Sequence, residues 1–306
     1  MPITPTKFIW MDGKLIPWEG AKIHVLTHTL HYGLGVFEGI RCYRAEDGPA
    51  VFRLKDHIRR LENSARIMGM SLPYSFEELV AAVKDTIKAN EIEECYIRPI
   101  AFYGYGEMGL NPKNSPVNVA IALWPWGTYL GKEGLEKGVR VAISSWLRID
   151  SRTLPPQSKT VANYTNSILA KLEALRGGYD EAILLNAQGH VTEGPGENVF
   201  IVKDGALLTP PLSSGALAGI TRDSVLKIAE EMGIKAREED ISRDQLYRAD
   251  EAFFTGTAAE ITPIREIDGH PIGNGVKGPI TEKIQRKFFD IVHGKEPKFK
   301  HWLDYV

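Results

Sequence analysis

One lysine stands among uncharged residues near the middle of the chain, in the stretch Pro155-Pro-Gln-Ser-Lys-Thr-Val-Ala-Asn-Tyr-Thr-Asn166. The two prolines end regular structure before it. Where such a lysine is enclosed, desolvation disfavours the ammonium form and frees an amine that can attack a carbonyl, as formation of a Schiff base requires. Most loop lysines are simply solvated, so the pattern alone is weak. Lys159 is therefore a candidate nucleophile that needs support from the rest of the sequence.

Two carboxylates flank a glycine-rich bend in Glu193-Gly-Pro-Gly-Glu-Asn198. Glycine allows the backbone to turn sharply there. Glu193 lies at the end of a short predicted strand, which favours a buried position beside a cationic ligand atom, because a buried charge needs a partner. We interpret Glu197 instead as a solvated turn residue.

Two loops of small residues could bind an anion. Gly215-Ala-Leu-Ala-Gly-Ile-Thr221 leads into a predicted helix, whose first N–H groups and dipole favour a phosphate. An ordinary helix N-cap by Thr221 explains the same segment equally well. Thr255-Gly-Thr-Ala-Ala259 follows an apolar strand, and small residues at a strand end let backbone amides approach a ligand closely.

Other familiar patterns do not fit their context. Gly104-Tyr-Gly-Glu-Met-Gly109 matches GxGxxG, but Leu110-Asn-Pro-Lys-Asn-Ser-Pro116 cannot supply the helix that a dinucleotide site needs. His24, His28 and His31 have the spacing of zinc ligands on a helix. Because Val25-Leu26-Thr27 and the glycines that follow make that helix doubtful, we interpret the histidines as structural or pocket residues and predict no metal. Neither GxSxG nor HExxH occurs.

The composition narrows the class of partner. A chain of 306 residues, 43% hydrophobic and 25% charged, is ordinary for a globular protein with two cores. A net charge of −2 gives no long-range field for nucleic acid or anionic lipid, so a small-molecule ligand is favoured. There is no apolar run of about 18 residues and no apolar leader, and Cys42 and Cys95 are interpreted as reduced core residues. We therefore expect a cytoplasmic protein that does not span a membrane.

The first half of the chain is predicted to form an α+β unit, which would position some of these residues. Asp12-Gly13 predicts a hairpin between residues 8 and 18, and a second hairpin joins 36–44 to 50–53. Apolar spacing predicts a helix that begins near Lys55, and a capping box of Ser75 and Glu78 predicts another that ends near Asn90. Strands follow at 95–103 and 117–124. This order predicts helices on one side of a mostly antiparallel sheet.

The second half alternates short strands with helices. A Pro, Gly and aromatic-rich stretch predicts a linker at 125–137, between a smaller domain at 1–124 and a larger domain at 138–306. The predicted helices cover residues 165–176, 221–232, a short segment that begins at a capping box of Ser242 and Gln245, and 281–292. The predicted strands cover residues 139–146, 182–185, 190–192, 198–203, 206–208, a segment near 234, and 252–254.

Several of these features together resemble the pyridoxal-phosphate enzymes of class IV: Lys159 with Tyr164, Glu193-Gly-x-Gly-Glu-Asn198, Gly219-Ile-Thr221 and Thr255-Gly-Thr-Ala258. Three stretches of the first half are similar to branched-chain amino-acid aminotransferases in particular: Tyr32-Gly-Leu-Gly-Val-Phe-Glu-Gly-Ile-Arg41, Tyr96-Ile-Arg-Pro99 and Trp124-Pro-Trp-Gly-Thr-Tyr129. The resemblance runs in order from about Phe8 to the C-terminus. It implies a two-domain α+β enzyme of fold type IV, D-amino-acid aminotransferase-like, with a smaller N-terminal α/β sandwich and a larger C-terminal domain that binds pyridoxal 5′-phosphate.

By this resemblance, Lys159 would hold the cofactor as a Schiff base and then act as the general base that moves the substrate Cα proton. Glu193 would keep the pyridine nitrogen protonated, and Tyr164 would hydrogen-bond the ring hydroxyl. Arg60 would contact the phosphate, with the adjacent Arg59 as the alternative. The implied cofactor-binding residues are Arg60, Lys159, Tyr164, Glu193, Leu217, Gly219, Ile220, Thr221, Gly256 and Thr257.

The resemblance also implies where the substrate binds. The backbone of Thr257 and Ala258 and the Tyr96 hydroxyl would meet the α-carboxylate, and Arg98 would accept the side-chain carboxylate of glutamate. One pocket must then serve acidic and apolar side chains, so Arg98 has to be paired or turned aside when leucine is bound. The implied substrate-binding residues are Tyr32, Phe37, Gly39, Tyr96, Arg98, Trp126, Tyr129, Thr257 and Ala258.

These features predict an enzyme that exchanges amino groups between L-leucine, L-isoleucine or L-valine and 2-oxoglutarate. Its partners would be amino acids, 2-oxo acids and copies of itself, in at least a dimer and with a hexamer as the larger alternative. A dimer is implied because relatives take some pocket residues, such as the counterpart of Tyr32, from a neighbouring subunit. Two alternatives stay open: a D-amino-acid or R-amine transaminase on the same scaffold, and a catalytically silent binding or structural protein of this fold.

Overall fold

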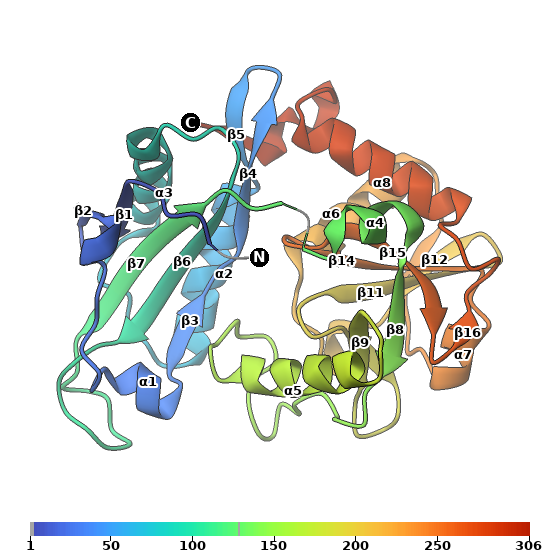
Figure 1. Cartoon of the computed structure of the whole chain (residues 1–306), viewed down its shortest axis with the longest axis horizontal. Coiled ribbons are helices and arrows are strands. Elements are labelled where there is room, and N and C mark those ends of the chain that lie inside the picture. Colours follow the sequence, from blue (N-terminus) through green and yellow to red (C-terminus); the bar gives the residue numbers. More distant parts are fainter. Residues whose placement is uncertain (1–2, 128) are drawn as a thin grey trace. The chain divides into compact units, whose positions relative to one another are not determined.

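A computed structural model describes residues 3–127 and 129–306 (Figure 1), and it groups the chain into two compact units. Unit 1 comprises Met1–Trp126, Ser158–Ala162 and Ile291–Val306. Unit 2 comprises Gly127–Gln157 and Asn163–Asp290. The five-residue segment that carries Lys159 therefore belongs to unit 1, while both of its flanks belong to unit 2. The domain boundaries proposed from composition stay a prediction.

Unit 1 is built on an antiparallel sheet with the strand order β17-β5-β4-β6-β7-β1-β2, in which β3 also pairs with β6. The first hairpin turns at Asp12 and Gly13, which both have positive φ, as the sequence predicted. The strands of the whole sheet are β1 (Phe8–Met11), β2 (Lys14–Pro17), β3 (Gly35–Phe37), β4 (Ile40–Ala45), β5 (Gly48–Phe52), β6 (Cys95–Tyr103), β7 (Val117–Trp124) and β17 (Leu303–Tyr305).

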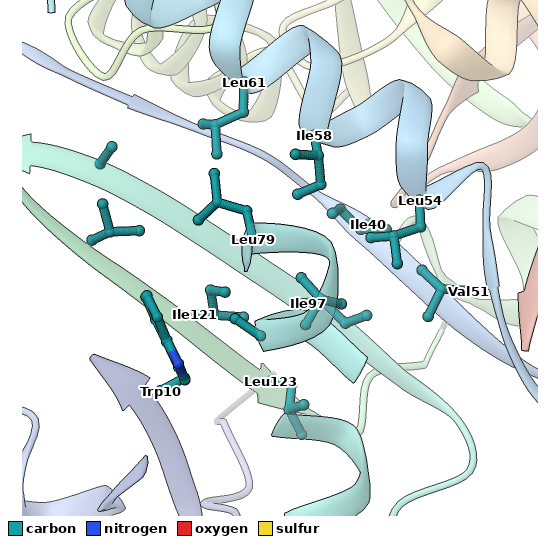
Figure 2. Close-up of a cluster of buried hydrophobic side chains, with 14 of the residues drawn as sticks. Trp10, Ile40, Val51, Leu54, Ile58, Leu61, Leu79, Ile97, Ile121 and Leu123 are labelled. Atoms are coloured by element: carbon teal, nitrogen blue, oxygen red, sulfur yellow. The ribbon is translucent and has the colours of Figure 1, made fainter. Parts of the chain in front are cut away.

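Helices α2 (Leu54–Ile67) and α3 (Phe76–Asn90) pack on this sheet through one shared apolar core. Figure 2 shows Leu54 and Ile58 of α2 directed toward Ile40 of β4, and Leu61 directed toward Leu79 of α3. The spacing of four and three residues within α2 places its three side chains on one stripe of the helix. The remaining helical segments of the unit are α1 (His28–Tyr32) and the 3-10 turns η1 (Trp18–Gly20) and η3 (Pro297–Trp302).

Strand β6 divides its side chains between the two faces of the sheet. Cys95, Ile97 and Ala101 point into the core that the helices cover. Since successive side chains of a strand point to opposite faces, Tyr96 and Arg98 lie on the other face. Helices α2 and α3 therefore do not cover the face that carries Tyr96 and Arg98. The two cysteines, Cys42 and Cys95, are free and buried, as predicted.

The segment Ser158–Ala162 pairs with the edge of β3. Val36 forms an antiparallel bridge with Thr160, Val161 N donates to Gly35 O at 2.8 Å, and Phe37 N donates to Lys159 O at 3.0 Å. The hydroxyl of Thr160 also donates to Gly35 O at 2.8 Å. These bonds hold the backbone of Lys159 in an extended conformation against the sheet of unit 1.

Unit 2 contains a mixed sheet in the order β10-β9-β8-β15-β14-β11-β12-β13, in which β16 pairs with β15. Strands β11 and β14 are antiparallel neighbours, and the stacked rings of Phe200 and Phe253, 5.2 Å apart, mark its buried core. Its strands are β8 (Val139–Ile143), β9 (Glu181–Leu185), β10 (Val191–Glu193), β11 (Asn198–Lys203), β12 (Ala206–Thr209), β13 (Ala236–Glu238), β14 (Glu251–Gly256), β15 (Glu260–Ile267) and β16 (His270–Pro271).

The helices of unit 2 connect these strands. Short α7 carries the predicted capping box of Ser242 and Gln245, just as α3 in unit 1 carries that of Ser75 and Glu78. The helical segments are α4 (Gly131–Lys137), α5 (Asn163–Arg176), η2 (Leu212–Ser214), α6 (Ile220–Glu231), α7 (Arg243–Tyr247) and α8 (Pro279–Val292), whose last two residues belong to unit 1. The α+β fold class predicted from the sequence is confirmed.

The helix that would align His24, His28 and His31 does not form: α1 begins at His28, so His24 lies outside it, and Gly33 at φ 74° supplies a left-handed C-cap. Two local predictions were wrong. The predicted strand 36–44 breaks at Glu38-Gly39, and β3 pairs with β6 rather than with β5. Strand β15 was missed because Pro263 argues against a central strand.

None of the helices among residues 3–127 and 129–306 is both long and apolar enough to cross a membrane.

Candidate active site

Lys159 of unit 1 is half-buried, with its backbone fixed on both sides. Its N–H donates to Ser64 Oγ of α2 at 3.0 Å, and its carbonyl accepts from Phe37 N at 3.0 Å. Its Nζ lies 5.0 Å from the centroid of the Phe37 ring. The amine is therefore held against an aromatic wall while the backbone is anchored to helix α2 and strand β3.

Arg60 projects from α2 toward a buried carboxylate, whereas its neighbour Arg59 points away. Arg60 donates from Nε to Glu38 Oε1 at 2.7 Å and from Nη2 to Glu38 Oε2 at 2.9 Å. The side chain of Arg60 is 13% exposed, while that of Arg59 is 61% exposed and pairs with Glu62. Adjacent positions on a helix lie about 100° apart, which explains the difference. Arg60 is thus the arginine directed toward the interior of unit 1.

A histidine completes this cluster. His57, one helical turn before Arg60, shares a 2.7 Å hydrogen bond between its Nδ1 and Glu38 Oε2. Burial lowers the pKa of His57 despite the carboxylate beside it. Burial alone would raise the pKa of Glu38, but the charge of Arg60 and the hydrogen bonds from Arg60 and His57 hold it well below its usual value. Glu38 is therefore ionised and fully paired at neutral pH.

The open face of β6 gathers aromatic rings around a guanidinium. Arg98 lies 4.7 Å from the Phe37 ring centroid and 5.3 Å from that of Tyr96, and its Nη2 is 3.2 Å from the Tyr96 hydroxyl. Trp126 meets Tyr96 edge-on, with ring centroids 4.4 Å apart. A Cβ on Gly39 would overlap the Tyr96 hydroxyl, so any larger residue there would force the Tyr96 ring to move. Five of the predicted substrate residues thus lie together in unit 1.

Tyr32 lies elsewhere in unit 1. It stands on short helix α1, is exposed, and contacts the ring of His28 with centroids 4.6 Å apart. The nearby histidines bond to the backbone: His28 Nε2 lies 2.7 Å from Gly109 O, and His31 Nε2 lies 2.9 Å from Val25 O. In the described part of the chain, no cluster of three or more His, Cys, Asp or Glu could hold a metal ion.

Glu193 of unit 2 is buried and paired with a cation that the sequence did not single out. Arg148 Nη2 lies 2.8 Å from Glu193 Oε1, and both side chains are 6% exposed. Its other oxygen accepts from Leu217 N at 2.9 Å and from Asn198 Nδ2 at 3.1 Å. Glu193 is buried, as predicted, while its pairing with a cationic ligand atom stays a prediction.

The loop of unit 2 that was predicted to bind an anion leads directly into a helix. Helix α6 begins at Ile220, with Gly219 rather than Thr221 at the N-cap position and no side-chain cap. Thr221 is buried in the first turn. A Cβ on Gly219 would overlap Asn198 Oδ1, so glycine is required by this close approach.

Gly256 ends β14, with Thr257 and Ala258 in the turn before β15. Tyr164 lies half-buried in the first turn of α5.

The interpretation of Glu197 as a solvated residue was wrong. Glu197 is only 4% exposed and accepts from Gly196 N at 3.0 Å. Burial, with the negative charge of nearby Glu181, raises the pKa of Glu197 to about 8. Glu181 is itself buried and pairs with Lys171 Nζ at 2.7 Å, while this Nζ lies 5.5 Å from the Tyr129 ring centroid.

Comparison with known proteins decides the family. The family model for amino-transferase class IV matches residues 35–267. The chain belongs to the class IV aminotransferases. It is 50% identical over 298 residues to the branched-chain-amino-acid aminotransferase of Pseudomonas aeruginosa, across 97% of each chain. The crystal structure of the Escherichia coli branched-chain amino acid aminotransferase is 48% identical, with a TM-score of 0.96 over 98% of this chain and 99% of that one.

A third relative was solved with its cofactor. The crystal structure of the branched-chain amino acid aminotransferase from Thermobaculum terrenum in its PLP form is 38% identical, with a TM-score of 0.92 over 98% of each chain. The fold prediction is therefore confirmed at the level of the two-domain fold type IV scaffold.

The residues of this class IV aminotransferase fit pyridoxal 5′-phosphate, which presents an aldehyde, a phosphate and a ring nitrogen. Unit 1 offers the half-buried amine of Lys159 and the guanidinium of Arg60. Unit 2 offers the buried carboxylate of Glu193 and the amino end of α6 behind Gly219, where a Cβ would find no room. An amine, a carboxylate and cationic or dipolar anion binders are the donor set that this cofactor requires.

Sequence reasoning missed three charged residues of these clusters: Glu38, His57 and Arg148. Glu38 interrupts the apolar run from Leu34 to Ile40, and a lone acid inside a predicted strand signals a buried partner. His57 and Arg60 are three residues apart on a predicted helix, so they share a face. Arg148 carries no comparable signal, because its partner Glu193 is distant in sequence.

Proposed function

We propose that this class IV aminotransferase binds pyridoxal 5′-phosphate and exchanges amino groups between L-leucine, L-isoleucine or L-valine and 2-oxoglutarate. Three relatives named as branched-chain aminotransferases, 38–50% identical across nearly the whole chain, support the proposal. The observation that carries it is Arg98, stacked against Phe37 and Tyr96 in the predicted pocket. A guanidinium lying on aromatic faces can serve both a carboxylate and an apolar side chain.

The proposed cofactor residues come from both units. Arg60 and Lys159 lie in unit 1, and Tyr164, Glu193, Leu217, Gly219, Ile220, Thr221, Gly256 and Thr257 lie in unit 2. The amino end of α6 and Arg60 would neutralise the phosphate, and Glu193 would bind the ring nitrogen.

When bound, the cofactor supplies an electron sink for the charge that develops at the substrate Cα. Lys159 accepts the proton from Cα and later returns one, acting as the general base and acid of the exchange. Glu193 keeps the ring nitrogen protonated, and its pairing with Arg148 fixes the carboxylate in place. Tyr164 donates to the ring hydroxyl and limits rotation of the ring.

Substrate selection falls to unit 1 and to the turn after β14. The backbone of Thr257 and Ala258 and the hydroxyl of Tyr96 bind the α-carboxylate. Arg98 accepts the side-chain carboxylate of glutamate. When leucine binds, Arg98 keeps its contacts with the Tyr96 hydroxyl and the aromatic faces, which avoids an unpaired buried charge. Phe37, Trp126, Tyr129 and Tyr32 complete the apolar wall.

We assign the protein to the cytoplasm and to a homo-oligomer of at least two chains. Unit 1 exposes several large apolar side chains around α1, among them Val25, Leu30 and Tyr32, and such exposure favours burial against another chain. A net charge of −2 argues against nucleic acid as a partner. Sedimentation equilibrium measures the oligomer, and a monomer at micromolar concentration contradicts this assignment.

A panel of amino donors tests the proposed function. Purified protein with added pyridoxal 5′-phosphate is assayed with L-leucine, L-isoleucine, L-valine, D-alanine and an R-arylamine, each against 2-oxoglutarate. We expect the three branched-chain L-amino acids to be the best donors. Negligible L-leucine activity beside a good D-donor or R-amine overturns the proposal in favour of another transaminase. If no absorbance of bound cofactor develops, the protein is a silent member of the fold.

A further inference from the structure

Glu38 is fully buried in unit 1, and hydrogen bonds satisfy both of its oxygens. Oε1 accepts from Arg60 Nε at 2.7 Å, and Oε2 accepts from Arg60 Nη2 at 2.9 Å and from Gly39 N at 3.2 Å. The resemblance gives this carboxylate no role. A buried charge costs several kcal/mol unless it is paired, so the position has to serve a purpose or be compensated by its partner.

The pairing fixes the plane of the Arg60 guanidinium. The carboxylate takes the edge formed by Nε and Nη2, in a side-on bidentate arrangement with two nearly parallel hydrogen bonds. Because the guanidinium is planar, this contact determines where the opposite edge, formed by Nη1 and the second proton of Nη2, is directed. An arginine without such a partner would distribute this edge over several rotamers.

His57 keeps Glu38 in place on its other side. Its Nδ1 lies 2.7 Å from Oε2, and since an ionised carboxylate only accepts, Nδ1 carries the proton. Burial favours the neutral imidazole. The charge of Glu38 is therefore matched by Arg60, while His57 contributes a hydrogen bond that prevents the carboxylate from rotating.

One face of α2 carries both this cluster and the anchor of Lys159. His57, Arg60 and Ser64 follow each other at spacings of three and four, which aligns them on a single stripe. Ser64 Oγ accepts from Lys159 N at 3.0 Å, and Ser64 O accepts from Ser158 Oγ at 3.1 Å. A single rigid helix thus sets the guanidinium and the lysine backbone relative to each other.

We infer that Glu38 is a positioning residue for phosphate recognition: it holds the Arg60 guanidinium in the orientation that binds the cofactor phosphate, and it acts only through Arg60. The inference rests on the proposed function, in which Arg60 contacts that phosphate. Pre-organisation of this kind removes the cost of ordering a long side chain when the ligand arrives. It predicts that Glu38 affects the phosphate end of the cofactor and leaves the aldehyde end unaffected.

Pyridoxal, which lacks the phosphate but keeps the aldehyde, separates the two ends. The full-length protein is freed of cofactor, and dissociation constants for pyridoxal 5′-phosphate and pyridoxal are measured by absorbance titration. In Glu38→Gln the new amide turns a donor toward Arg60, so the preference for the phosphorylated form is expected to fall at least about tenfold. Glu38→Asp, which keeps the charge on a shorter side chain, is expected to retain part of it.

Two further variants make the test specific. Arg60→Met is expected to lower the same preference, and Glu38→Gln added to Arg60→Met is expected to lower it no further, because the two residues act as one unit. Ser64→Ala, on the same helix face but bonded to Lys159, is expected to weaken both ligands equally. Thermal unfolding of each variant identifies those that fold, and Glu38→Asp replaces Glu38→Gln in the cycle if the latter does not.

The outcomes separate this inference from the proposed function. If Arg60→Met lowers the preference but folded Glu38→Gln or Glu38→Asp leaves it unchanged, Glu38 is not a positioning residue. An additional loss in the double variant also overturns the inference, since Glu38 would then act independently of Arg60. If the unmodified protein binds neither ligand, or Arg60→Met changes nothing, the proposed placement of the cofactor fails instead.

Discussion

Arg148 and Glu193 form a buried ion pair in unit 2, with Nη2 and Oε1 2.8 Å apart and each side chain 6% exposed. Both partners are side chains of the protein, so the pair needs no ligand to form. The carboxylate proposed to bind the ring nitrogen therefore already has a cationic neighbour that holds its charge and direction.

Replacing Arg148 by methionine is expected to destabilise the cofactor-free protein by about 3–5 kcal/mol, because Glu193 is left buried with one cationic partner removed. Saturating pyridoxal 5′-phosphate should restore part of this loss, since the protonated ring nitrogen supplies a new cation. Chemical denaturation with and without cofactor measures both values. Arg152→Met, at an exposed pair with Asp150, is the control and should change stability by less than about 1 kcal/mol. An equal loss with and without cofactor would contradict the expectation.

Replacing Gly39 by alanine is expected to impair substrate binding and leave cofactor binding intact. The added methyl group overlaps the Tyr96 hydroxyl, so the ring must move and its hydrogen bond with Arg98 is disturbed. We expect kcat/KM for L-leucine to fall about tenfold or more, with an unchanged dissociation constant for the cofactor. Gly20→Ala, which has no atom within 4 Å of the added Cβ, is the matched control. Wild-type kinetics of Gly39→Ala would show that Tyr96 has no role in the pocket.

Replacing Arg98 by alanine should harm acidic substrates far more than apolar ones. The lost charge-assisted contact with a side-chain carboxylate is expected to lower kcat/KM for glutamate and 2-oxoglutarate by about 10–100-fold. L-Leucine should lose much less, because its side chain meets only the aromatic surroundings of Arg98. Steady-state kinetics measure kcat/KM for leucine and for glutamate. Equal losses for the two donors would refute the dual use of the pocket. Arg44→Ala, at an exposed pair with Glu93, serves as the control.

The pH dependence of stability should reveal the buried acid Glu197. Its pKa is raised in the folded protein from 4.5 to about 8 by burial and by Glu181, so the folded state holds more protons than the unfolded chain in that window. The contribution of Glu197 to the free energy of unfolding is then fully present below about pH 4.5 and decreases as the pH rises toward 8. Glu197→Gln, which cannot ionise, should flatten this decrease, as measured by unfolding temperature between pH 5 and 9.

Glu133→Gln provides the comparison for that experiment, because its carboxylate is 80% exposed and forms only a surface pair with Lys137. It should keep the slope of the unmodified protein. If Glu197→Gln keeps that slope as well, the turn at Glu197 does not hold a proton at neutral pH.

Much of the local structure could be predicted because it depends on residues close in sequence. The capping boxes at Ser75 and Ser242, the turn at Asp12-Gly13 and the strands β6 and β7 all follow from short-range pattern and formed as expected. The failures have long-range causes. Pro263 sits in a strand that neighbouring strands stabilise on both sides, and Glu197 turns inward because burial of the whole bend outweighs its intrinsic preference for water.

The candidate site divides in the same way. Residue types and their order were sufficient to single out Lys159, Glu193 and the loop before α6, and to relate them to one family. Sequence could not choose between Arg59 and Arg60, since one helical residue of rotation decides which side chain meets Glu38. Nor could it find Arg148 as the partner of Glu193, which lies far along the chain.

What the sequence determined by itself is the set of residue types available to this protein: a lysine, a carboxylate and two loops of small residues, in an order typical of class IV aminotransferases. The tertiary structure alone decided the pairing of the charges, Arg60 with Glu38 and His57, Arg148 with Glu193, and Lys171 with Glu181. The physical reason is that buried charges are stable only beside a partner, and which partner is near depends on how strands and helices pack rather than on the order of residues along the chain.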